Sequence, residues 1–199
     1  MYAHPWALSC LVTVMLCPAI VRGASVEVLL HNTDGMPDLI VDEMKSELLA
    51  LMGPAGIEIH WPDALDSTVA VQGDLVMVEL RGGCGRPPQS NPKPRVVQLG
   101  SSAVADGRVL PFIWVDCTPL VRLLEPHLTP EQRERRDLVY GRATARVLAH
   151  ELYHVLRHTL IHTKTGLTKA RFDPSDLLDQ RPEFPIATNL GFARPPAAP

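Results

Sequence analysis

The sequence predicts an α+β domain in which a mixed, twisted sheet is backed by helices. Short extended segments and helical periodicity follow one another in the order β, α, β, β, which suits such a sheet. A long helix near the C-terminal end carries closely spaced histidines. The chain of 199 residues, less a predicted leader, leaves about 175 residues, which is one domain with room for a sizeable core.

In the N-terminal half of the domain, the spacing of apolar residues predicts each strand and helix. Alternating residues predict a strand over 26–31, and apolar residues at helical spacing predict a helix over 36–52. Gly53, Pro54 and Gly56 end this helix. Further strands are predicted over 57–61, 75–81, 95–99 and 109–115.

The last two predicted strands are joined by a turn signal. Ala105-Asp106-Gly107-Arg108 has the Asp-Gly pair that is typical of tight turns. We therefore expect 95–99 and 109–115 to provide an edge strand, along which an extended peptide substrate can pair its backbone.

The C-terminal half is predicted to be mainly helical. Residues 118–124 indicate a short helix, and Thr129 begins a capping box with Pro130 at the first helical position. The long central helix is expected to begin there, or after a break near Tyr140-Gly141. A short C-terminal subdomain follows this helix.

Both ends of the chain differ in composition from the domain at 25–192. Residues 8–20 form an apolar run that is short for a membrane span, and small or aliphatic residues follow it, so residues 1–24 are predicted to be a signal peptide cleaved after Gly23 or Ala24. An uncleaved anchor is the alternative. Residues 193–199 form a Pro- and Ala-rich tail. The protein is expected to be secreted or periplasmic.

Two cysteines remain after removal of the leader. Cys84 and Cys117 are an even pair in an oxidising compartment, which favours a disulfide over two separate buried thiols. Each stands without a CxxC partner, which argues against zinc binding by these cysteines.

The net charge of −3 includes no basic tract. Neither a nucleic-acid partner nor, after cleavage of the leader, a membrane partner is expected, and we expect a monomer.

The segment AHELYHVLRHTLIH contains the HExxH pattern. His150 and His154 lie one helical turn apart, so both imidazoles can reach one cation, while Glu151 projects to the neighbouring arc. This arrangement is typical of two zinc ligands and a general base for water. The alternative is a surface helix in which Glu151 pairs with Arg146 or Arg157.

A catalytic zinc takes about three protein ligands. On a continued helix His158 would lie about 12 Å from His150, too far to share one ion. His162, placed after a chain reversal, is the better candidate for the third ligand, and His158 is expected to be an exposed residue at the helix end.

The segment HELYHVLRHTLIHTKTGLTKARF resembles short secreted zincin-like metallopeptidase-like proteins of Acidobacteria and related soil bacteria, which are mostly uncharacterised. The resemblance implies a zincin-like fold, Zn²⁺ bound by His150, His154 and His162, and Glu151 as catalytic base. His158 stands where a turn glycine is common in these proteins, and Thr168 where some have a methionine beneath the metal. The third histidine follows His154 after seven residues, two more than in metzincins.

The predicted function is hydrolysis of a peptide or protein substrate by a secreted zinc metallopeptidase. Zinc lowers the pKa of a bound water, and Glu151 accepts its proton and later passes it to the leaving amine. No tyrosine follows His162, so the role of holding the oxyanion is vacant or falls to Arg171, His158 or the zinc. The alternative function is a secreted zinc-containing binding or structural module without catalytic activity.

Overall fold

The computed structural model of the chain describes residues 24–62, 73–84 and 98–179. The strands in these ranges form one sheet in the order β2-β1-β3-β5-β4. They are β1 (Ala24–Asn32), β2 (Ile57–His60), β3 (Asp74–Arg81), β4 (Gly100–Ala105) and β5 (Arg108–Asp116). β4 runs antiparallel to β5, and the other pairs are parallel. The predicted mixed sheet is therefore confirmed. The predicted cleavable leader, apart from Ala24, and the predicted tail lie outside the described residues.

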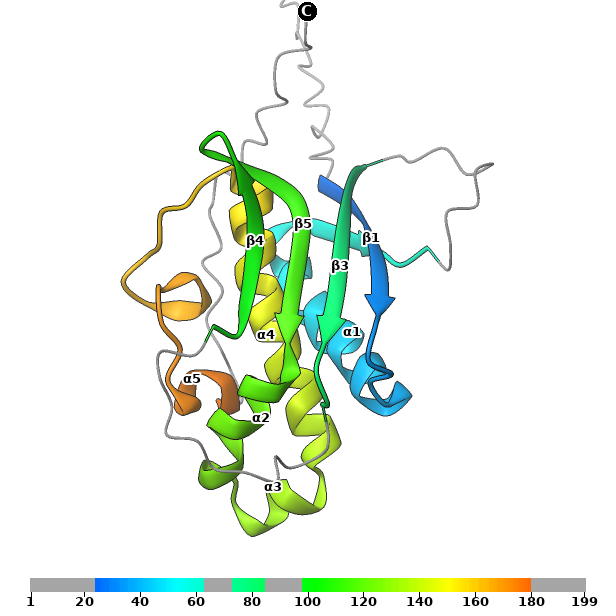
Figure 1. Ribbon diagram of the computed structural model, residues 1–199, viewed down its shortest axis with the longest axis vertical. Helices are drawn as coiled ribbons and strands as arrows, with labels where there is room; N and C mark the ends of the chain where they lie inside the picture. The colour runs from blue at the N-terminus through cyan, green and yellow to red at the C-terminus, as the bar shows by residue number, and fades with distance from the viewer. Residues whose placement is uncertain (1–23, 63–72, 85–97, 180–199) are drawn as a thin grey trace, which may run out of the picture.

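Helices back this sheet, as the sequence predicted. Those described are α1 (Asp38–Met52), α2 (Cys117–Leu124), α3 (Pro130–Glu134), α4 (Arg136–Arg157) and α5 (Pro174–Leu178). Figure 1 shows α1 and α4 behind the strands, and these two helices also pack along each other. None of the helices in the described ranges is long and apolar enough to cross a membrane.

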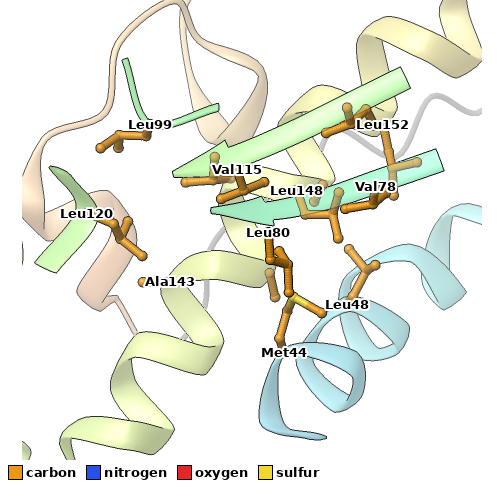
Figure 2. Close-up of a cluster of buried hydrophobic side chains, with 14 of the residues drawn as sticks. Met44, Leu48, Val78, Leu80, Leu99, Val115, Leu120, Ala143, Leu148 and Leu152 are labelled. Atoms are coloured by element: carbon orange, nitrogen blue, oxygen red, sulfur yellow. The ribbon is translucent and has the colours of Figure 1, made fainter. Parts of the chain in front are cut away.

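The core lies between the sheet and the two long helices. Alternate residues of β1 and β3, such as Val28 and Val78, are buried against the helices because strand side chains point to opposite faces in turn. On α1, buried residues recur at helical spacing, including Met44 and Leu48. Figure 2 shows side chains of α1, β3, β5 and α4 meeting in this layer. Helix α4 contributes Leu148 and other residues on the same arc.

The long helix does not begin where the sequence predicted. The predicted capping box at Thr129 is present, but it begins the short helix α3, and α4 starts after a break at Arg135. Tyr140 and Gly141 are continuous helix. Gly141 serves the packing of α4 on α1, since a Cβ there would lie 2.7 Å from Glu43 Cβ and 2.8 Å from the Ile40 carbonyl oxygen.

The edge strand also lies a few residues later than predicted. The predicted strand over 95–99 falls mostly outside the described residues, Gln98 and Leu99 are not strand, and β4 is Gly100–Ala105. The predicted turn is correct: Asp106 and Gly107 have positive φ values of 50° and 74°, as a two-residue hairpin requires. The hairpin pairs Ala105 with Arg108, and this register fixes the position of β4.

Cys84 and Cys117 form a disulfide, as predicted. Their Cα atoms are 4.9 Å apart and 33 positions separate them in the sequence. The bond ties the end of β3 to the start of α2. Closing a loop of this length stabilises a fold by about 3 to 4 kcal/mol in the chain-entropy account.

The close approach of α1 and α4 is tested by changing Gly141 to Ala. The added methyl group would meet the backbone of α1, so we expect the free energy of unfolding in urea to fall by about 1 to 3 kcal/mol. Gly53→Ala is the matched control, because Gly53 has helical dihedrals of −56° and −46° and no atom within 4 Å of its Cβ position. Equal stability of the two variants would contradict this account of the packing.

Candidate metal centre

Two histidines of α4 share one buried face of the helix. His150 and His154 are 7% and 5% exposed. His150 Nδ1 lies 2.7 Å from the carbonyl oxygen of Leu167, and His154 Nδ1 lies 2.8 Å from that of Thr159. A carbonyl oxygen can only accept, so each Nδ1 carries the hydrogen and donates it. In the neutral rings the lone pair is therefore on Nε2.

The chain reverses direction at the end of α4 and brings in a third imidazole. His158 ends the helix with a left-handed backbone, at φ 47° and ψ 42°. This is the conformation that glycine adopts most readily. His162 Nε2 then lies 3.2 Å from His154 Nε2. His158 is exposed and is not part of this histidine cluster.

The segment after His162 forms a short loop that holds the Leu167 carbonyl against His150. Thr163 donates its backbone N–H to the Thr168 carbonyl at 3.0 Å, and the two hydroxyl oxygens lie 2.6 Å apart. Thr168 is fully buried and Leu167 is nearly so. This short loop fixes the Leu167 carbonyl that orients His150. Thr168 thus has a structural role in this loop.

The arrangement of the ring nitrogens fits a metal ion. His150 Nε2 and His154 Nε2 are 3.0 Å apart, and the candidate ligand atoms of all three histidines lie within 4.8 Å of one another. Two neutral Nε2 atoms that both bear lone pairs repel each other at this distance unless a cation lies between them. Tetrahedral zinc with bonds near 2.0–2.1 Å separates its nitrogens by about 3.3 Å, close to the 3.0 and 3.2 Å between His154 Nε2 and the Nε2 atoms of His150 and His162.

Glu151 lies beside this cluster and is 7% exposed. The Ser102 hydroxyl of β4 donates to its Oε2 at 2.7 Å. The ion pair between Glu151 and Arg146, considered as an alternative, does not form. Arg146 instead contacts Glu47 Oε1 at 2.8 Å and donates to the Leu177 carbonyl at 2.8 Å.

Burial changes the acid–base properties of the site. In the metal-free protein, burial lowers the pKa of His150 to about 4 and also lowers that of His154. Both imidazoles are therefore neutral near pH 7, which is the form that binds metal. Burial raises the pKa of Glu151 to about 7, against the opposing effect of hydrogen bonds from Ser102. A nearby cation would lower this pKa again, since it favours the carboxylate.

The histidines and Glu151 line a cleft of about 780 Å³. Its walls are the start of β4, the helix α4 and the segment 169–172, and apolar side chains such as Leu123 and Phe172 contribute to it. Lys169 on its rim is paired with Asp176 at 2.6 Å. Arg171, a sequence candidate for holding an oxyanion, also lines the cleft and is exposed.

The structure thus brings together all four residues that the sequence singled out: His150, Glu151, His154 and His162. Sequence reasoning missed Ser102 and the carbonyls of Thr159 and Leu167. Ser102 stands 49 positions before Glu151, and no spacing pattern connects the two. Comparisons of the chain with protein-family models, curated proteins and solved structures found no match.

The raised pKa of Glu151 predicts a pH-dependent stability difference in the metal-free protein. Its pKa in the folded state is about 7, above the ordinary value of 4.5. The folded state then binds more protons between these values, so the free energy of unfolding falls as the pH rises from 4.5 to about 7. Glu151→Gln removes this effect. The free energy of unfolding of Glu151→Gln, measured by thermal unfolding, should therefore rise relative to that of the wild type between pH 5 and pH 8. We expect this rise to be roughly 1 to 3 kcal/mol.

The histidines contribute equally to both proteins, so their titration cancels in the comparison. Glu58→Gln is the control, because Glu58 is an exposed carboxyl on β2. If the difference in stability between wild type and Glu151→Gln stays constant with pH, burial does not raise the pKa of Glu151.

Proposed function

We propose that the protein is a secreted zinc metallopeptidase that hydrolyses peptide bonds. The observation that carries this proposal is the convergence of three imidazoles, two with Nδ1 held by backbone carbonyls, next to the buried carboxyl of Glu151. His150, His154 and His162 would hold the ion. Three neutral nitrogen ligands suit zinc, which keeps a further position open in catalytic sites.

The zincin-like assignment of the fold belongs to the same proposal. It is supported by the mixed sheet backed by helices, with both HExxH histidines on the central helix α4. The short segment after α4 returns to this helix and supplies His162. These are the features that the resemblance to zincin-like proteins implies.

The chain's own residues suit general acid–base catalysis. When bound, zinc supplies Lewis-acid chemistry, lowering the pKa of water and polarising a carbonyl. Glu151 accepts a proton from the attacking water and donates it to the departing amine. The carbonyls of Leu167 and Thr159 hold the rings of His150 and His154, which keeps their Nε2 atoms directed at the ion.

An extended peptide is the substrate that the cleft suits. β4 is at the edge of the described sheet, where only β5 pairs with it, and its first residues line the cleft. An unpaired strand edge can bind an extended chain through backbone hydrogen bonds. We therefore propose that the substrate lies along β4, with its scissile carbonyl near the three histidines.

The disulfide supports the proposed location. Disulfides persist in oxidising compartments and are rare in the cytosol. The Cys84–Cys117 bond is consistent with a secreted or periplasmic protein, as the predicted leader also indicates.

The metal centre is tested by its composition. We expect the purified protein to contain about one zinc per molecule, measured by plasma mass spectrometry. His162→Ala should lose most of the zinc because it removes one of three ligands. His158→Asn is the control, since asparagine tolerates the left-handed backbone and His158 is outside the cluster. A folded wild-type protein without metal affinity would overturn the proposal.

The reaction is tested by Glu151→Gln. This variant should retain zinc but cleave unfolded protein substrates at least about 100-fold more slowly, since it removes the general base. Glu58→Gln, which changes an exposed carboxyl far from the cluster in sequence, should behave as wild type. If wild type and Glu151→Gln both bind zinc and are equally inert across a broad peptide library, a non-catalytic zinc-containing module becomes the better assignment.

A further inference from the structure

On β4, Ser102 donates a side-chain hydrogen bond to the carboxyl of the proposed catalytic base, Glu151. We propose that Ser102 is a positioning residue that holds the Glu151 carboxyl in the orientation needed for proton transfer. This inference rests on the proposed function, because it assigns a role in the same reaction. Its primary evidence is the 2.7 Å hydrogen bond from the Ser102 hydroxyl to Glu151 Oε2.

The position of Ser102 in the sheet makes this contact specific. Ser102 pairs with Ile113 and Gly100 pairs with Val115. Ile113 and Val115 are buried in the core with the helices, and directly paired residues point to the same face of a sheet. Ser102 therefore stands on the face where β1, β3 and β5 carry aliphatic side chains. A hydroxyl among these aliphatic side chains needs a polar partner, and the carboxyl of Glu151 provides it.

The neighbouring glycine allows the strand to come close enough to α4. A Cβ at Gly100 would lie 2.8 Å from Val147 Cγ1 and 3.2 Å from Glu151 Cγ. Any larger residue would push β4 away from the helix or displace the Glu151 side chain. The register of β4 also shifts between Ser102 and Val104.

The hydroxyl has two acceptors within reach but only one hydrogen to donate. Glu151 Oε2 is at 2.7 Å and the Glu151 backbone carbonyl is at 3.2 Å. The shorter contact is to the carboxyl oxygen, which is the stronger acceptor when ionised. Holding one oxygen restricts rotation of the carboxyl group, so the base meets water in one geometry.

Ser46 provides a control outside the site. It is an exposed residue of α1 and is not among the residues that line the cleft. Ser46→Ala and Ser102→Ala therefore make the same chemical change, and only the second removes a contact to Glu151.

The kinetic experiment compares Ser102→Ala, Ser102→Thr and Ser46→Ala in the full-length zinc-loaded protein. We expect Ser102→Ala to lower kcat about tenfold or more with little change in KM and full zinc content, since a hydrogen bond to a charged group is lost. Ser102→Thr keeps the hydroxyl and should restore most of the rate. A Ser102→Ala kcat within about twofold of wild type, or an equal loss in Ser46→Ala, would overturn the proposal.

A structural measurement distinguishes this proposal from the proposed function. Crystal structures of wild type and Ser102→Ala should show Glu151 in one conformation in the former and in more than one in the latter. A single, unchanged Glu151 conformation in Ser102→Ala would overturn the positioning role even if the protein is an active peptidase. If no peptide is cleaved by wild type, disorder of Glu151 in Ser102→Ala still supports the contact, while the peptidase assignment fails.

Discussion

The site depends on the orientation of two imidazoles by backbone carbonyls. His150 and His154 come from one helix, but the groups that turn their Nε2 atoms toward each other come from the chain after the helix, at Thr159 and Leu167. The left-handed residue at His158 starts the reversal that places these carbonyls and His162. Orientation of the rings and arrival of the third histidine are thus consequences of the same turn.

A rigid helix is needed for this geometry to persist, and α4 is held on several sides. Its core face packs on α1 and the sheet, where Gly141 permits close contact with α1. Its other side faces β4, where Gly100 permits a second close contact. Arg146 joins it to the C-terminal segment through the Leu177 carbonyl. Because α4 is packed in this way, small displacements of the histidines are resisted by the whole core.

The sequence predicted the features that depend on local periodicity or spacing. The strands β1, β2, β3 and β5 and the helix α1 were placed to within a few residues, because burial of one face leaves a repeating apolar pattern. The histidine cluster was found because one helical turn sets the spacing of His150 and His154. His158 was excluded as a ligand because on a continued helix it would lie too far from His150 to share one ion. The pairing of the two cysteines followed from their number and the expected compartment.

Features that depend on register or backbone atoms were not predicted. β4 was placed too early because its sequence is less apolar than the segment before it, although the hairpin turn determines its position. Ser102 was missed for the same reason, as its contact with Glu151 exists only once that register is known. Gly141 was read as a possible break in the helix, whereas it is a packing residue. The carbonyls that orient the histidines leave no trace in residue type, since every residue has one.

The burial of Glu151 also affects how its carboxyl would respond to a cation held by the three histidines. In a metal-free site the low-dielectric surroundings favour the protonated carboxyl, which cannot accept a proton from water. The same burial keeps His150 and His154 neutral and ready to bind a cation. A cation held there would in turn favour the ionised form of Glu151. Cation binding and ionisation of the Glu151 carboxyl would therefore be coupled, because both depend on one charge in one buried cleft.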